Sequence, residues 1–110
     1  MALVGDGAAL YGIQGLWTAA YYHISVIFLI ANNAQYKILK VAGAVMQLPQ
    51  VTQGNYLGMD LVDPEVDFVG LARSFGVEAR RVTEPEELSE AVRESLHRTE
   101  PILLDVPIER

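Results

Sequence analysis

Residues 5–33 decide the fold, and they read GDGAALYGIQGLWTAAYYHISVIFLIANN. Two short polar motifs, Gly5-Asp6-Gly7 and Asn32-Asn33, frame a segment that reads as one helix followed by one strand. The distance between the motifs is what a loop, a crossover helix and a return strand need in a βαβ unit. We therefore expect the side chains of Asp6 and Asn33 to lie at the same edge of a parallel sheet, where ligands gather in such folds.

The first half of this stretch has the apolar pattern of a helix. Over residues 9–22, apolar side chains recur at spacings of three and four, which predicts an amphipathic helix despite Gly12 and Gly15. Trp17 and Tyr21 lie on its apolar face. We expect both rings to pack in the core rather than to stack on a ligand.

Four segments have the composition of strands. Residues 24–31, ISVIFLIA, are β-branched and aromatic, which predicts a central parallel strand covered on both faces. Residues 2–4 predict the end of another buried strand, because a glycine turn follows this apolar run. Residues 77–82 predict an exposed strand, and residues 102–106 predict a short final one.

The remaining segments alternate with these strands as helices and loops. Helices are expected over 35–46, over 65–75 with Gly76 ending it, and from an N-cap at Thr83 to about Arg98. Residues 48–64 lack a clear period and predict a long connection, a class of segment that often serves as a lid. The alternation predicts an α/β fold with a parallel sheet flanked by helices.

Composition narrows the function classes. The chain has 110 residues, is 51% hydrophobic and carries a net charge of −6 without a cluster of basic residues, so we expect one domain and no nucleic-acid partner. It has no cysteine, which fits a reducing compartment, and cytoplasm is the expected location. The longest apolar run, residues 26–31, is far shorter than the roughly 20 residues of a membrane helix, so we expect a soluble protein that does not bind membranes.

The two motifs have the chemistry of a metal and diphosphate site. Proteins usually hold a diphosphate through a bridging Mg²⁺ and through backbone N–H groups at the start of a helix. Asp6 supplies a carboxylate ligand, while Gly5 and Gly7 let the backbone turn tightly and approach phosphate oxygens. Asn33 offers an amide oxygen, and the backbone carbonyl of Gln35 could complete the protein ligands.

Each motif also has a plainer interpretation. Gly-Asp-Gly is a common tight turn, and Asn-Asn alone indicates even less. Their joint position at the ends of two strands in one βαβ unit favours a functional site. His23 and His97 have no catalytic partner in the sequence, and we expect capping or surface roles for both.

The pattern resembles a known family. Gly5-Asp6-Gly7, the intervening helix and strand, and Asn32-Asn33 look like the diphosphate-binding motif of thiamine diphosphate-dependent enzymes, and the resemblance covers nearly the whole chain. Residues 16–20, LWTAA, and Tyr36 look most like benzoylformate decarboxylases. Gly58-Met59-Asp60 and residues 66–77 resemble later parts of the same cofactor domain. The resemblance implies that residues 1–110 are a single partial domain, the C-terminal part of the diphosphate-binding domain.

The resemblance also implies roles for individual residues. The side chains of Asp6 and Asn33 and the carbonyl of Gln35 would bind Mg²⁺, and Tyr36 would donate its hydroxyl to the diphosphate. Leu39, and with it Ile38, would lie near the thiazolium and the substrate, although ordinary helix packing explains Leu39 equally well. The cofactor-binding set is therefore Gly5, Asp6, Gly7, Ala8, Asn33, Tyr36 and Leu39, and the metal set is Asp6, Asn33 and Gln35.

Three residues depart from the family pattern. Ala8 stands where relatives often have a serine, which removes one hydroxyl from the phosphate site. Ala34 and Lys37 replace common glycines around the metal-binding loop. A non-glycine residue disfavours a positive φ, so these two positions put the loop conformation in question.

The implied function is that of a fragment of a Mg²⁺- and thiamine diphosphate-dependent 2-keto acid decarboxylase resembling benzoylformate decarboxylase. The alternatives are an acetolactate synthase-type carboligase and a non-catalytic binding or assembly module. In the family, the glutamate that activates the cofactor comes from another domain of a neighbouring subunit, and this chain offers no catalytic residue of its own. We expect residues 1–110 alone to be inactive, and expect the active form to need the remaining domains or a partner subunit in a homo-oligomer, with a small 2-keto acid as substrate.

Overall fold

Four parallel strands form one sheet in the order β1-β2-β4-β3. The structure is a computed structural model, and it describes residues 1–110. The strands are β1 (Ala2–Gly5), β2 (Ile27–Asn32), β3 (Glu78–Arg81) and β4 (Ile102–Pro107). The predicted α/β fold with a parallel sheet is therefore confirmed.

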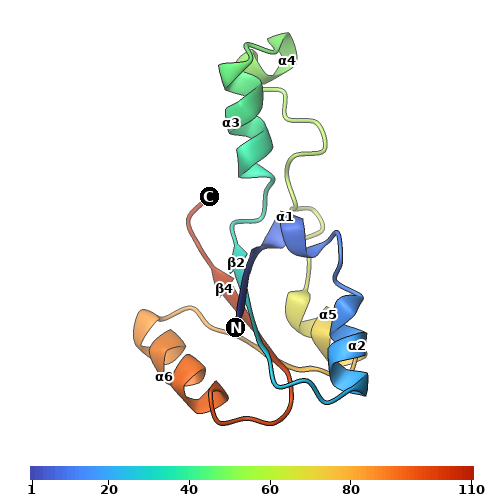
Figure 1. Ribbon diagram of the computed structural model, residues 1–110. Coiled ribbons are helices and arrows are strands. Elements are labelled where there is room, and N and C mark those ends of the chain that lie inside the picture. Colours follow the sequence, from blue (N-terminus) through green and yellow to red (C-terminus); the bar gives the residue numbers. More distant parts are fainter.

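Helices cover both faces of this sheet (Figure 1). Alternate residues of β4 point to opposite faces, so Leu103 packs in a core beneath α2 and α5, while Ile102 and Leu104 pack beneath α6. None of the helices has the length and apolar composition required to cross a bilayer. The helices are α1 (Asp6–Ala9), α2 (Gly15–Tyr21), α3 (Lys37–Val45), α4 (Pro49–Thr52), α5 (Phe68–Ser74) and α6 (Pro85–Ser95).

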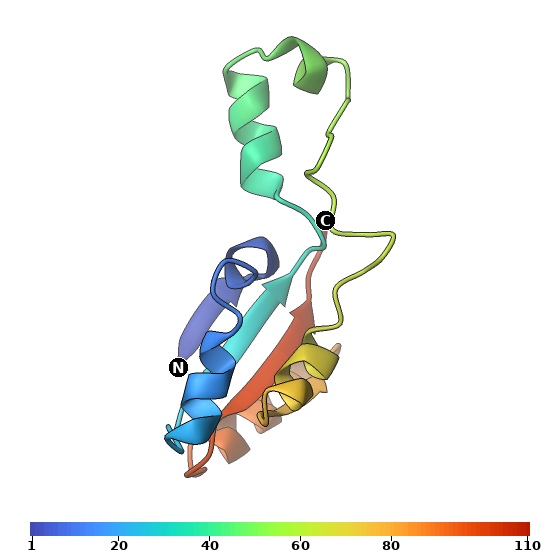
Figure 2. The same ribbon diagram turned by 90° about the vertical axis from the view of Figure 1, so that its right-hand side faces the viewer.

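Helices α3 and α4 extend away from the sheet as an arm, which makes the molecule elongated, with extents of 49 × 29 × 23 Å (Figure 2). The only buried residue of α3 is Gly43, which approaches Val51 of α4 closely. The predicted connection over 48–64 thus contains the short helix α4 before an irregular segment returns to the sheet. The arm begins directly after the carboxyl end of β2, next to the two polar motifs.

The prediction of one continuous helix over 9–22 is wrong. The structure has two short helices, α1 and α2, separated by turns over residues 10–14. Between them, the backbone bonds three residues back, from Gly12 N–H to Ala9 O at 3.1 Å and from Gly15 N–H to Gly12 O at 2.9 Å. Glycine is about 1 kcal/mol less favourable than alanine inside a helix, and two glycines within four residues allow these tighter turns.

The break also reverses the prediction for Trp17 and Tyr21. The buried side of α2 is formed by Leu16 and Ala19, three positions apart, and Leu16 packs in the core with Ile30 and Leu103 of the sheet. Trp17 and Tyr21 instead point outward, 54% and 61% exposed, and stack on each other with ring centroids 5.0 Å apart. Neither ring packs in the core of this chain.

Strand β1 is present as predicted, but it is not buried. It pairs only with β2 and forms one edge of the sheet. Leu3 lies on the same face as Leu104, but it is exposed and does not belong to the core beneath α6. The opposite edge strand is β3, which lies within the predicted residues 77–82. Residues 102–106 lie in β4, which pairs on both sides and contains the fully buried side chains Leu103 and Leu104.

Two helix starts differ from the sequence prediction. Helix α5 begins at Phe68 instead of residue 65, because Asp67 caps it by accepting a hydrogen bond from Gly70 N–H at 2.8 Å. The N-cap of α6 is Glu84, without a side-chain capping bond, and Thr83 lies outside the helix. Gly76 does end α5, with a φ of 83° that suits glycine.

Candidate functional site

The two polar motifs lie side by side where β1 and β2 end. Gly5 pairs with Ala31 in the parallel register, so Asp6 follows the end of β1 and Asn33 follows the end of β2 at the same edge of the sheet. In the amide orientation that satisfies hydrogen bonding, the Asn33 side chain donates to Asp6 Oδ1 at 3.1 Å and to the Gln35 carbonyl at 2.9 Å. A carboxylate, a side-chain amide and a backbone carbonyl therefore converge on one point.

The convergence has the chemical features of an oxygen-ligand metal site. Asp6 is only 3% exposed, and its Oδ2 has no hydrogen-bond partner, which is costly for a buried carboxylate unless a cation compensates. Rotating the Asn33 amide by 180° would present its oxygen, in place of its nitrogen, beside the Asp6 and Gln35 oxygens. Mg²⁺ accepts such a set of one carboxylate and neutral oxygens, completed by phosphate and water. The residues present thus fit this metal, and their role as ligands stays a prediction.

A cavity of about 250 Å³ adjoins these groups. It is lined by every residue that the sequence assigned to the cofactor or the metal except Leu39. Leu39 lies on α3, half-exposed and outside the cavity, whereas its neighbour Ile38 lines it. The assigned residues that share the cavity are Gly5, Asp6, Gly7, Ala8, Asn33, Gln35 and Tyr36.

The two glycines of the first motif have different reasons to be glycine. Gly5 has an ordinary extended conformation, with φ −70° and ψ 150°, and a Cβ there would meet nothing within 4 Å. A Cβ on Gly7 would lie 2.5 Å from Cε1 of Tyr36, so only glycine lets this ring pack against the turn. Helix α1 has just four residues, so the site has the free N–H groups of a single turn in place of the longer helix expected from the sequence.

The loop after β2 adopts the strained conformation that the sequence put in question. Ala34 has a φ of 54°, whereas Lys37 simply begins α3. Two hydrogen bonds hold the Ala34 peptide groups: its N–H donates to Asn32 Oδ1 at 3.1 Å, and its carbonyl accepts from Leu61 N–H at 2.9 Å. The surrounding contacts therefore impose a left-handed conformation on a residue with a Cβ.

We expect the substitution Ala34→Gly to stabilise the purified protein by about 1 kcal/mol, because the left-handed strain is removed and only partly offset by the greater freedom of glycine in the unfolded chain. A thermal melt measures the effect. Ala42→Gly, in the middle of α3, is the matched control and should lower the melting temperature. A decrease for both variants would show that Ala34 is not strained.

A buried polar pair that sequence reasoning missed supports the same loop. Asp105, in β4, is 1% exposed and accepts a hydrogen bond from Asn32 Nδ2 at 3.0 Å, and Asn32 in turn accepts the bond from Ala34. Burial raises the pKa of Asp105, and the negative charges of Glu65 and Asp67 add to this, while Asn32 and Arg81 oppose it. Nothing in the local pattern marks Asp105, because it stands within an otherwise apolar strand, ILLDV.

The raised pKa of Asp105 predicts a pH effect with a definite sign. Between the ordinary value of 3.8 and the higher folded value, the native state binds more protons than the unfolded state, so this group makes stability fall as pH rises. The substitution Asp105→Asn removes that loss, and the free energy of unfolding of the variant minus that of the parent should rise with pH across this window. Urea denaturation at several pH values measures this difference.

Asp60 provides a control of opposite sign for this measurement. The hydrogen bond from Lys40 lowers the pKa of Asp60, so its stabilising contribution is present above 3.8 and is lost as pH falls toward the folded value. For Asp60→Asn, the same difference should therefore fall as pH rises, in a window below 3.8. If the free energy of unfolding of Asp105→Asn minus that of the parent stays constant or falls as pH rises, the pKa of Asp105 is not raised in the folded protein.

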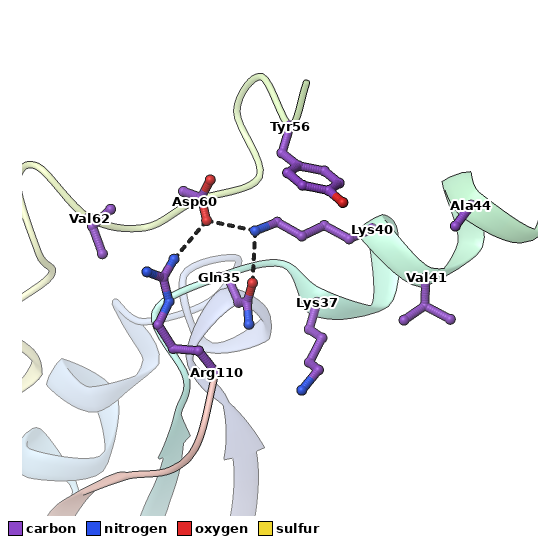
Figure 3. Close-up of a pocket in the computed structure, with 9 residues that line it drawn as sticks. All are labelled: Gln35, Lys37, Lys40, Val41, Ala44, Tyr56, Asp60, Val62 and Arg110. Carbon is purple, nitrogen blue, oxygen red and sulfur yellow. Dashed lines mark hydrogen bonds and ion pairs between the residues drawn. The ribbon is translucent and has the colours of Figure 1, made fainter. Parts of the chain in front are cut away.

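A larger cavity, of about 690 Å³, lies at the base of the arm and shares Gln35 and Lys37 with the smaller one (Figure 3). In it, Lys40 Nζ donates to Gln35 Oε1 at 2.8 Å and to Asp60 Oδ1 at 2.7 Å, and Arg110 donates to the same Asp60 oxygen at 2.7 Å. The sequence marked Asp60 only as part of the family resemblance and did not mark Lys40. Their contact crosses an irregular loop, where no periodicity could reveal it.

Known proteins resemble this chain along nearly its full length. Residues 1–106 match the family described as thiamine pyrophosphate enzyme, C-terminal TPP binding domain. Benzoylformate decarboxylase of Pseudomonas aeruginosa is 36% identical over 107 residues, which are 97% of this chain and 19% of that protein. A Mycobacterium tuberculosis protein named as an acetolactate synthase large subunit, IlvX, is 39% identical over 114 residues, which cover 98% of this chain and 21% of that protein.

The solved structures agree with these sequence matches. The thiamine diphosphate-dependent 4-hydroxybenzoylformate decarboxylase of Rhodococcus jostii RHA1 superposes with a TM-score of 0.86 at 36% identity. The superposition covers 97% of this chain and 19% of that one. The chain therefore spans about a fifth of the length of the relatives it matches.

Proposed function

We propose that this chain, which belongs to the family of thiamine pyrophosphate enzymes and matches their C-terminal TPP-binding domain, anchors the diphosphate end of that cofactor through Mg²⁺. The observation that carries the proposal is the convergence of Asp6, Asn33 and the Gln35 carbonyl, with one buried Asp6 oxygen left without a partner. The adjoining cavity is lined by the same residues and by Tyr36. Residues 1–110 would then be the C-terminal part of the diphosphate-binding domain.

Each residue of the site has a separate task in this proposal. Asp6 supplies the only carboxylate, Asn33 and the Gln35 carbonyl supply neutral oxygens, and diphosphate oxygens and water complete the shell. Gly7 lets the Tyr36 ring pack against the turn, and Tyr36, which lines the cavity, would donate its hydroxyl to a phosphate oxygen. When bound, the cofactor supplies the chemistry that breaks the bond between the carboxylate and the carbonyl carbon of a 2-keto acid.

For the reaction, we propose decarboxylation of a 2-keto acid, as in benzoylformate decarboxylase. This choice is supported by the 36% identity with the Pseudomonas aeruginosa enzyme and by the superposition on the Rhodococcus jostii decarboxylase. The second candidate is an acetolactate synthase-type carboligase, which the 39% identity with the Mycobacterium tuberculosis relative favours. In both cases the groups that activate the cofactor and select the substrate would come from other domains or from a partner subunit, within a homo-oligomer.

Product analysis of the complete protein separates these functions. With Mg²⁺ and thiamine pyrophosphate, a decarboxylase should convert benzoylformate into benzaldehyde and carbon dioxide, whereas a carboligase should convert two pyruvate molecules into acetolactate and carbon dioxide. We expect the aldehyde, and we expect residues 1–110 alone to turn over neither acid. Acetolactate as the main product would contradict the decarboxylase proposal. Cofactor binding without any product from either acid would favour a non-catalytic module.

A further inference from the structure

The segment that carries the Gln35 carbonyl is paired with a distant part of the chain. Gln35 forms an antiparallel bridge with Asp60, and two backbone bonds flank it: Tyr36 N–H donates to Met59 O at 2.8 Å, and Leu61 N–H donates to Ala34 O at 2.9 Å. Residues 34–36 are therefore held from one side by residues 59–61. The direction of the Gln35 carbonyl depends on this short ladder, because the peptide groups on both sides of Gln35 are fixed by it.

One ammonium group connects both sides of the ladder (Figure 3). Lys40, in the first turns of α3, donates to the side-chain oxygen of Gln35 at 2.8 Å and to Asp60 Oδ1 at 2.7 Å. Its Nζ also lies 4.6 Å from the ring centroid of Tyr56, within the range of a cation–π contact. The side chain of Lys40 is only 17% exposed, while that of Asp60 is 40% exposed, so the ammonium is partly shielded from water although its carboxylate partner is not.

Lys40 is the only cationic side chain that bonds to Gln35, whereas Arg110 shares Asp60 with it but makes no bond to Gln35. Gln35 is 8% exposed, and its side-chain oxygen accepts from Lys40 while its carbonyl faces the Asn33 amide. The contact therefore acts on a residue whose backbone oxygen is a proposed metal ligand. The pairs Arg80–Glu94 and Arg98–Glu78 touch no residue of the site.

We propose that Lys40 is a positioning residue of the metal site, which holds Gln35 so that its carbonyl oxygen faces the cation. This inference rests on the proposed function, since it assigns a task only if Asp6, Asn33 and Gln35 bind Mg²⁺. Groups that orient metal ligands from outside the ligand shell typically contribute 10- to 100-fold to metal affinity. Lys40 is the group that the structure places in that position behind Gln35.

The test replaces Lys40 by methionine in the complete protein. Lys40→Met keeps an unbranched apolar side chain over Tyr56 and removes both hydrogen bonds. Calorimetric titration of thiamine pyrophosphate at a series of Mg²⁺ concentrations should show that half-maximal binding needs about 10-fold more Mg²⁺, while affinity at saturating Mg²⁺ stays within about 3-fold. Lys40→Arg keeps a cationic donor and should restore most of the loss.

Replacing Mg²⁺ by Ca²⁺ gives a readout that a general loss of stability would not change. Mg²⁺ requires a nearly ideal octahedral shell, whereas Ca²⁺ tolerates irregular geometry and more ligands. If the Gln35 carbonyl is misplaced in Lys40→Met, the concentration of Ca²⁺ for half-maximal binding should rise less than that of Mg²⁺. Equal increases for both metals would contradict a positioning role.

Two further variants keep the test decisive. Arg98→Met removes an ion pair of 2.6 Å with Glu78, away from the site, and should leave the Mg²⁺ dependence unchanged. Asp60→Asn weakens the same network but leaves Lys40 on Gln35, so it should give a smaller shift than Lys40→Met and still applies if that variant does not fold. Unchanged Mg²⁺ dependence in both Lys40→Met and Asp60→Asn would overturn the inference. A parent protein that binds the cofactor without Mg²⁺ would instead refute the proposed function.

Discussion

The substitution Asp6→Ala is expected to weaken Mg²⁺-dependent binding of thiamine pyrophosphate by at least about 100-fold, because it removes the only carboxylate of the proposed shell. Loss of a group that merely orients a ligand already costs 10- to 100-fold, and Asp6 would bind the metal directly. Asp6→Asn keeps the shape and one oxygen but loses the charge, so its loss should be smaller. Calorimetry on the complete protein, with and without Mg²⁺, measures both variants.

Asp6→Ala should not lower the thermal stability of the metal-free protein. The Asp6 carboxylate is buried with one unpartnered oxygen, and removing such a group relieves a desolvation cost. Glu90→Ala, an exposed carboxylate on α6, serves as the control for charge alone and should leave binding unchanged. Unaltered cofactor affinity in Asp6→Ala, or a melt showing that it has lost its fold, would remove the support for Asp6 as a metal ligand.

The second large effect is expected at Gly7. In Gly7→Ala, the new Cβ would lie 2.5 Å from Cε1 and 2.6 Å from Cδ1 of Tyr36, so the ring has to move. Its hydroxyl would leave the proposed phosphate position, and returning the ring to that position on binding would restore the clash, a kind of overpacking that typically costs 1–3 kcal/mol. We expect cofactor binding at saturating Mg²⁺ to weaken about 10-fold or more, since 1.4 kcal/mol corresponds to a factor of ten.

Two controls separate the ring contact from other effects of the added methyl group. Gly15→Ala places the same group at the start of α2, where nothing lies within 4 Å, and should leave binding unchanged. In a Tyr36→Ala background the clash is absent, so Gly7→Ala should add little further loss, which is the non-additivity expected for residues in contact. Full additivity of the two substitutions would contradict the proposed contact.

The sequence predicted the sheet and the meeting of the two motifs because both follow from local composition. The β-branched and aromatic residues of 24–31 predicted a strand, and residues 27–31 lie in β2, whereas residues 24–26 lie outside it. Parallel strands bring their carboxyl ends to one edge, which fixes where Asp6 and Asn33 lie. The end of α5 at Gly76 could be predicted for a similar reason, since glycine adopts the positive φ found there without steric cost.

The features that could not be predicted depend on which face of a helix is buried, or on contacts between residues that are far apart in the sequence. Trp17 points outward because α2 packs on the sheet through Leu16, and a pattern in which apolar residues occur all round the helix does not show which face packs. Asp105 reads as an interruption of an apolar strand until β2 places Asn32 beside it. The contact of Lys40 with Asp60 requires the irregular segment after α4 to return to the base of the arm.

Locating the metal itself tests the proposed site most directly. Crystals of the complete protein grown with thiamine pyrophosphate and Mn²⁺, which prefers the same oxygen ligands as Mg²⁺, would show the metal by its anomalous scattering. We expect one peak within about 2.5 Å of a carboxylate oxygen of Asp6, the amide oxygen of Asn33 and the carbonyl oxygen of Gln35, next to the diphosphate. A peak that lacks Asp6 as a ligand, for example one beside Asp60 in the larger cavity, would contradict this expectation.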